Sequence, residues 1–237
     1  GSEMCIRDSY VTVGLWQAGQ NRIFIDCNVQ SPADMLSPGR IGMTAILPVR
    51  FTAMKWYGKG PLETYPDRQC GGRMGVYSED VRNQPFYLRP QEYGLHTESR
   101  SMRLTDPDRA DFVRFEAACP MAMSAVPYSD LQLWNARHPP ELPAPEALYV
   151  HLDYAHRGLG NSSCGPDVLP TYRIDDRPCR FGFALEAGLG EREDNPFGPI
   201  PEEIPAYHPW KAVGEQDRTP SYRDPSDPDQ RSNAGMV

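Results

Sequence analysis

The sequence has no apolar run long enough to cross a membrane. A transmembrane helix needs roughly 20 consecutive apolar residues, and no stretch of the 237 residues approaches that length; hydrophobic residues make up 39%. No basic segment followed by an apolar one opens the chain either, so there is no sign of a secretory leader. We therefore expect no membrane partner and a cytoplasmic location, with the periplasm as the open alternative.

An excess of positive charge is also missing. Asp and Glu number 32 against 24 Lys and Arg, which gives a formal net charge of -8. Binding to nucleic acid depends on neutralising phosphates with Lys and Arg. The charge balance therefore argues against nucleic acid as a partner, whereas a neutral, polar partner such as a sugar remains compatible with it.

Cysteine and histidine show none of the spacings that mark metal or disulfide sites. The chain has no CxxC pair and no HExxH. We expect reduced thiols that are mostly buried, and no metal site. The six cysteines are Cys5, Cys27, Cys70, Cys119, Cys164 and Cys179.

The alternation of apolar and polar residues predicts an all-β protein. Short candidate strands separated by Gly and Pro turns are typical of an antiparallel sandwich. The candidates are residues 10–15, 22–29, 41–51, 54–57, 99–104, 112–117, 122–126, 148–154 and 180–185. Pro48 marks its strand as an edge or a bulge. One short helix is expected after an N-cap at Ser129, ending before the prolines at 139 and 140, with Trp134 facing the sandwich.

Composition divides the chain into three parts. Residues 1–9 have no clear period and look appended, so we expect them to be non-native or disordered. Residues 10–187 form the predicted sandwich. From 188 to 237 the chain becomes dense in Pro and charged residues, with few apolar ones. Such a segment cannot bury enough surface to order itself, so a flexible tail is expected there.

Three segments carry a resemblance to a known family. They are WYGKGPLETYPDR at 56–68, YLRPQEYG at 87–94, and ELP at 141–143 followed by LDYAHRGLG at 152–160 and SCGP at 163–166. These resemble, in the same order, the WYGxGPxExYxDR, YxxPQExG and ELP…LDxxxxGxGxxSxGP elements of the C-terminal domain of family-two β-galactosidases. The resemblance extends over about residues 10–185.

The resemblance implies a large antiparallel β-sandwich of the galactose mutarotase-like type, truncated at its N-terminal side. The family hydrolyses terminal β-galactosides such as lactose with retention, using two glutamates on a TIM barrel. No barrel pattern is present in these residues. We therefore expect no catalytic residue and no hydrolysis from this chain alone. Cofactors are expected only in the parent's barrel, as Mg²⁺ and Na⁺, and the partners are that barrel, the sugar and further copies of the parent.

A glycine-rich loop at 158–166 is the best candidate for substrate contact. In many members of the family it presents a Trp to the sugar, and here the matching position is Cys164, which offers no aromatic surface. Asn161, Ser162 and Ser163 could hydrogen-bond sugar hydroxyls or only order the loop. Cys164 is not expected to act as a nucleophile, because no His with a supporting acid is placed beside it.

Charged residues in the other two segments have two interpretations. Glu63, Asp67 and Arg68, together with Gln91 and Glu92, could contact the sugar or dock against the barrel. The interpretation that we place first is structural, because an irregular loop needs side chains to bond its backbone groups.

Three alternatives stay open beside the leading hypothesis. A free-standing carbohydrate-binding module would use the same sandwich. A mutarotase-like epimerase would need a His and a Glu facing one another, and nothing in the spacing places His96 or His151 opposite a Glu. An incomplete product without function would expose sheet edges that promote aggregation.

Overall fold

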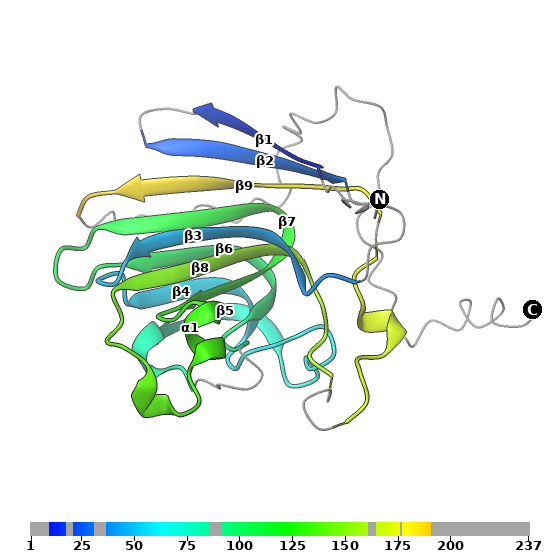
Figure 1. Ribbon diagram of the computed structural model, residues 1–237. Helices are drawn as coiled ribbons and strands as arrows, with labels where there is room; N and C mark the ends of the chain where they lie inside the picture. The colour runs from blue at the N-terminus through cyan, green and yellow to red at the C-terminus, as the bar shows by residue number, and fades with distance from the viewer. Residues whose placement is uncertain are drawn as a thin grey trace, which may run out of the picture. The chain divides into compact units, whose positions relative to one another are not determined.

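The computed structural model describes residues 10–17, 21–30, 37–85, 92–160, 165–175 and 177–190 (Figure 1). The predictions for residues 1–9 and for the tail from 191 onward lie outside these residues. Among the described residues, no helix combines the length and the apolar character needed to cross a membrane.

Seven strands form the larger of two layers, and all of their pairings are antiparallel (Figure 1). In spatial order they are β1 (Tyr10–Gln17), β2 (Arg22–Gln30), β9 (Cys179–Gly188), β7 (Phe112–Val126), β6 (His96–Thr105), β4 (Ala53–Gly60) and β5 (Arg73–Asp80). The smaller layer is the pair β3 (Arg40–Pro48) and β8 (Ala147–His156).

Strand β7 connects the two layers because it changes its neighbour along its length. Its first half pairs with β9 as far as Ala117, and its second half pairs with β8 from Ala122 onward. Pro120 lies between these halves and has no N–H to give to a ladder. The prediction of two separate strands at 112–117 and 122–126 was therefore wrong. The two ranges belong to one continuous strand that is irregular around its proline.

The core lies between the apolar faces of the two layers. Side chains from β2, β4, β6, β7 and β9 meet those from β3 and β8 in one cluster, in which Trp56 and Phe115 are almost fully buried. The predicted all-β antiparallel sandwich is therefore confirmed. Within the described residues β3 pairs with β8 alone, so the edge position indicated by Pro48 is also confirmed.

The short helix α1 (Asp130–Asn135) begins where its cap predicts. The Ser129 side chain accepts a hydrogen bond from the Gln132 backbone N–H, and the Gln132 side chain accepts one from the Ser129 backbone, which completes a capping box. The prediction that Trp134 faces the sandwich was wrong: its side chain is 58% exposed and Leu133 is buried instead. The described part of the chain also contains three single turns of 3₁₀ helix, η1 (Val81–Asn83), η2 (Pro139–Glu141) and η3 (Pro170–Tyr172).

Four of the six cysteines lie in the described residues, and all four are free thiols. Cys27 is buried in the core, while Cys119 and Cys179 are half-buried. Cys70 is exposed in the loop between β4 and β5, directly before Gly71 and Gly72. The expectation of mostly buried thiols was therefore wrong for Cys70.

Candidate functional site

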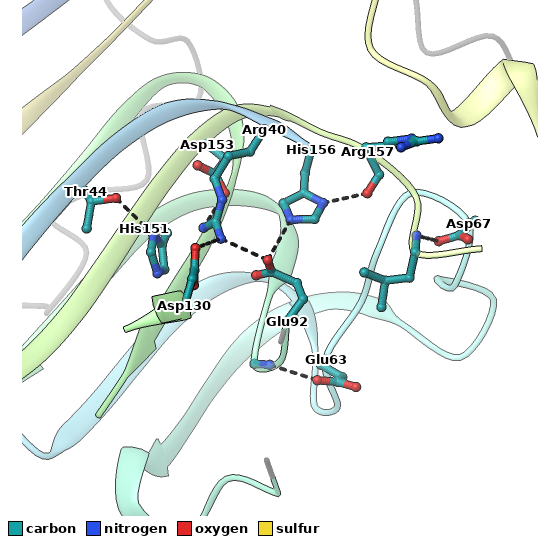
Figure 2. Close-up of polar contacts among 12 residues, drawn as sticks. Arg40, Thr44, Glu63, Asp67, Glu92, Asp130, His151, Asp153, His156 and Arg157 are labelled. Atoms are coloured by element: carbon teal, nitrogen blue, oxygen red, sulfur yellow. Dashed lines mark hydrogen bonds and ion pairs between the residues drawn. The ribbon is translucent and has the colours of Figure 1, made fainter. Parts of the chain in front are cut away.

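Parts of all three sequence segments meet at one end of the sandwich (Figure 2). The loop after β4 carries Glu63 and Asp67, the segment before β6 carries Glu92, and the residues after β8 continue into the glycine-rich loop. Glu63 accepts a hydrogen bond of 2.8 Å from the backbone N–H of Gly94. Segments distant in sequence are therefore held together by the side chains that the resemblance singled out.

Asp67 and Arg68 hold the first part of the glycine-rich loop. The Asp67 carboxylate accepts hydrogen bonds from the backbone N–H groups of Leu159, at 3.0 Å, and Gly160, at 2.8 Å. Arg68 donates to the Gly160 carbonyl at 2.6 Å. Both backbone groups of Gly160 are thus bound by side chains from another loop, directly before residues 161–164.

The backbone at Gly160 requires glycine for two reasons. Its φ of +59° lies in the left-handed region, which residues with a side chain rarely adopt. A Cβ there would also approach the Val168 nitrogen to 2.8 Å. Leu159 packs against the small apolar cluster of Tyr65, Leu95 and Ala122. Apolar contacts and hydrogen bonds therefore fix the same two residues of the loop.

Arg40 forms the centre of a second set of contacts next to this loop (Figure 2). Its guanidinium lies 2.9 Å from Glu92 and 2.6 Å from Asp130, the first residue of α1. A third carboxylate, that of Asp153 on β8, lies 3.8 Å away, which is too long for a hydrogen bond. One arginine thus joins the segment before β6, the start of α1 and strand β8.

A bulge makes room for the buried carboxylate of Asp153. The register between β3 and β8 shifts at Gly42, which pairs with Asp153. A Cβ at Gly42 would come within 2.3 Å of the Asp153 Oδ1. Because Gly42 has no side chain, the carboxylate occupies that space and stays almost fully buried beside Arg40.

Burial and charge shift the pKa values of this cluster in opposite directions. Burial raises the pKa of Asp153 to about 7, although the charge of Arg40 opposes the shift. Burial would also raise the pKa of Glu92, but His156, 3.6 Å away, and Arg40 together hold it below its ordinary value. Burial acts to lower the pKa of His156, and Glu92 outweighs it, so the pKa rises.

His151 behaves differently from His156. Its Nδ1 lies 3.1 Å from the hydroxyl of Thr44 on β3. Burial, followed by the charge of Arg40, lowers the pKa of His151 to about 4. His151 is therefore neutral at pH 7, while His156 next to Glu92 favours the charged form.

In the structure, each of two histidines lies next to a glutamate. The sequence spacing did not indicate either pair. His156 faces Glu92, and His96 lies 3.6 Å from Glu79. The His96 ring also stacks on Trp56, with the ring centres 3.9 Å apart. A general acid or base must reach an atom of its substrate, whereas both imidazoles are buried by protein. This arrangement suits packing better than the acid–base chemistry of an epimerase.

The predicted site residues divide into two groups. Asn161, Ser162, Ser163, Cys164 and Gln91 lie outside the described residues. Glu63, Asp67, Arg68 and Glu92 all bond loop backbone or neighbouring side chains, and their contact with a sugar or a barrel stays a prediction. Among the described residues, no group of three His, Cys, Asp or Glu side chains is arranged to hold a metal ion.

Sequence reasoning missed Arg40, Asp130, Asp153 and His156. One signal was available for Asp153, which is a carboxylate inside the predicted apolar strand 148–154 and within the LDYAHRGLG segment. A charge at a core position of a strand requires a partner. No pattern in the sequence identified Arg40 as that partner, because their meeting depends on the pairing of β3 with β8.

These features define an antiparallel β-sandwich whose loops at one end are tied together by buried charges. Residues 7–185 match the family model described as the β-galactosidase small chain. The chain therefore belongs to the β-galactosidase small-chain family.

Full-length relatives of this family are much longer than this chain. A β-galactosidase of Bifidobacterium adolescentis is 35% identical over 175 residues, which are 71% of this chain and 16% of that protein. The β-galactosidase of Arthrobacter sp. (strain B7) is 33% identical over 168 residues, with 67% and 16% covered. That of Staphylococcus xylosus is 31% identical over 156 residues, with 65% and 16% covered. The chain thus spans about one sixth of the length of the curated relatives that it matches.

Proposed function

We propose that this chain is a non-catalytic C-terminal domain of a family-two β-galactosidase, and that its loop 158–166 completes the sugar pocket of the parent. The substrate of the parent is a terminal β-D-galactoside such as lactose, hydrolysed with retention. The family membership supports this proposal. The hydrogen bonds of Asp67 and Arg68 to the start of the glycine-rich loop also support it.

The observation that carries the proposal is the binding of Gly160 by Asp67 and Arg68. Side chains that bond the backbone of an irregular loop give it order, and binding residues are often carried on loops that a rigid scaffold positions. Holding the base of a loop from both its N–H and its carbonyl limits where the next residues can lie. Those next residues are Asn161 to Cys164, which we propose to face the sugar.

The chemical step is assigned to the rest of the parent. Retaining hydrolysis needs a carboxylic acid and a nucleophilic carboxylate about 5 Å apart across the scissile bond. The buried carboxylates near Arg40 instead share one arginine and one imidazole. We propose that the two glutamates, and the Mg²⁺ and Na⁺ of the parent, lie on its barrel. We also propose that the sandwich supports a cytoplasmic homo-oligomer of the parent.

The test mixes the full chain with the Staphylococcus xylosus β-galactosidase from which the matching segment has been deleted. Hydrolysis of a chromogenic β-galactoside should appear on mixing and be absent from either protein alone. Asp67→Ala should reduce the recovered rate at least tenfold, because two loop amides lose their acceptor. Asp108→Ala is the matched control. It removes an exposed carboxylate from the turn between β6 and β7, which lies at the opposite end of β6 from the candidate site.

Other outcomes would contradict the proposal in different ways. Hydrolysis by this chain alone would show that a catalytic pair lies within it. A lack of recovery from a folded chain that binds galactose would favour the carbohydrate-binding module. A lack of recovery from a chain that aggregates would favour the incomplete product without function.

A further inference from the structure

The outer face of the larger layer carries a row of charged side chains that is mostly basic. Arg103 on β6 alternates with Met102 and Leu104, which are buried in the main core, so Arg103 points outward. Its register partners on β4 and β7 are Lys55 and Arg114. Three basic residues thus stand directly beside one another on three neighbouring strands.

The row continues over two further strands, and its charges do not balance. Arg114 pairs in register with Glu186 on β9, which in turn pairs with Arg22 on β2. Glu116, two positions along β7 from Arg114, accepts a hydrogen bond of 2.9 Å from Arg22 and one of 3.3 Å from Arg114. The four basic side chains of this row therefore share two carboxylates, and two positive charges are left in excess.

Arg103 holds its guanidinium in a position that suits an anion. The guanidinium carbon lies 4.0 Å from the centre of the Phe112 ring, which is itself buried. A guanidinium that stacks on a ring keeps its N–H groups at its edge, where two of them can bind one oxyanion together. Within the described part of the chain, no carboxylate lies within ion-pair distance of Arg103. Arg103 therefore offers fixed donors that no described residue uses.

The surrounding charges make this position unfavourable without an anion. Burial, followed by the charge of Arg114, lowers the pKa of Arg103 from its ordinary value, and the charge of Glu186 opposes this shift only in part. Like charges directly opposite one another destabilise a sheet, and Arg103 has one on each side. A bound dianion would neutralise the two excess charges and relieve both repulsions.

We propose that Lys55, Arg103 and Arg114 form a binding site for a phosphate group, carried by free phosphate or by a phosphate monoester. Arg103 binds two phosphate oxygens through the edge of its guanidinium, and the other two side chains contribute charge from strands about 4.8 Å to either side. A phosphate monoester carries about −1.5 to −2 charges at pH 7, which matches the excess of the row better than a carboxylate does. The site shares no residue with loop 158–166 or with the contacts of Arg40, so it goes beyond the proposed function.

The test follows thermal unfolding of the full chain in increasing inorganic phosphate, with the ionic strength held constant by potassium chloride. The unfolding temperature should rise with phosphate concentration, because the ligand binds the folded chain, with a Kd on the order of 1 mM. Line broadening in phosphorus NMR measures the same affinity without unfolding. Arg103→Gln should weaken binding roughly tenfold or more, and Arg103→Lys, which keeps the charge but loses the paired donors, should fall between the two.

Arg177→Gln is the matched control. Arg177 pairs with Asp175 before the start of β9, at the other end of that strand from Glu186, so its phosphate affinity should stay within about twofold of the unchanged chain. Glucose 6-phosphate is then measured in the same way. A higher affinity for this ester than for inorganic phosphate would identify an esterified ligand, and a lower one would identify free phosphate; both results support a phosphate site.

Three results would overturn the inference. The first is a rise in unfolding temperature no larger than that produced by chloride at the same ionic strength. The second is an equal rise for Arg103→Gln, which would place the phosphate elsewhere on the chain. The third is equal stabilisation by acetate, which would show that any small anion suffices. Asp67→Ala separates this inference from the pocket proposal, because it should bind phosphate like the unchanged chain and still restore little hydrolysis.

Discussion

Replacing Arg40 by Met removes the charge that three carboxylates share while keeping a side chain of similar length. Glu92 and Asp153 would be left beside one another in a largely buried site, with the His156 imidazole as their remaining basic partner. Removing one partner of a buried ion pair costs about 3–5 kcal/mol of stability. We expect a loss in this range for Arg40→Met at pH 8, where Asp153 is ionised.

The loss of stability caused by Arg40→Met should be smaller at acidic pH, because the charge of Asp153 depends on pH. The pKa of Asp153 in the folded protein is about 7, above its ordinary value. At pH 5 this group is already protonated, so Arg40→Met leaves one fewer buried negative charge. We expect the cost of the substitution to fall by at least about 1 kcal/mol between pH 8 and pH 5.

The assay is urea unfolding of the full chain, followed by tryptophan fluorescence at both pH values. Arg177→Met is the matched control, because Arg177 pairs with Asp175 at an exposed position. An exposed pair of this kind is worth less than about 1 kcal/mol at either pH. Arg40→Met with a cost as small as that of the control, or with an equal cost at both pH values, would refute the reasoning.

Three further predictions concern single contacts. Asp153→Asn should stabilise the chain progressively as pH rises from 4 to 8 in urea unfolding, because the stability of the unchanged chain falls as pH rises through the raised pKa; a pH-independent effect would contradict this. Asp67→Asn keeps an acceptor but loses the charge, so the amides of Leu159 and Gly160 should exchange hydrogen at least tenfold faster, and equal rates would argue against the clamp. Ser129→Ala removes the cap of α1 and should cost about 1 kcal/mol in thermal unfolding, whereas Ser129→Asp should retain most of that stability.

Much of the fold could be predicted because the strands bury one face each. The alternation of Ile23, Ile25, Cys27 and Val29 indicates β2 directly. Strand β5 was missed because its inward positions are Gly75, Tyr77 and Glu79, which do not form an apolar series. Gly75 is small so that the Tyr77 ring can lie against it, at 3.0 Å from where a Cβ would be. That reason is visible only in the folded chain.

The candidate site was predictable where it depends on loop chemistry and not where it depends on pairing. Glu63, Asp67 and Arg68 stand among Gly and Pro residues, where backbone groups lack ladder partners. Their bonds to Gly94, Leu159 and Gly160 follow that expectation. Arg40 and Asp153 are 113 positions apart, and the pairing of β3 with β8, with its register shift at Gly42, brings them together.

The charges of the Arg40 cluster balance only when Asp153 holds its proton. Arg40 and His156, whose pKa is raised by Glu92, then face the carboxylates of Glu92 and Asp130, so two basic groups meet two acidic ones. As pH rises through about 7, Asp153 ionises and adds a third negative charge, on a carboxylate that is itself buried. His156 directly precedes Arg157 and the glycine-rich loop, and its ring is held by Glu92. The contacts that order the end of β8 should therefore be most stable in the neutral to mildly acidic range.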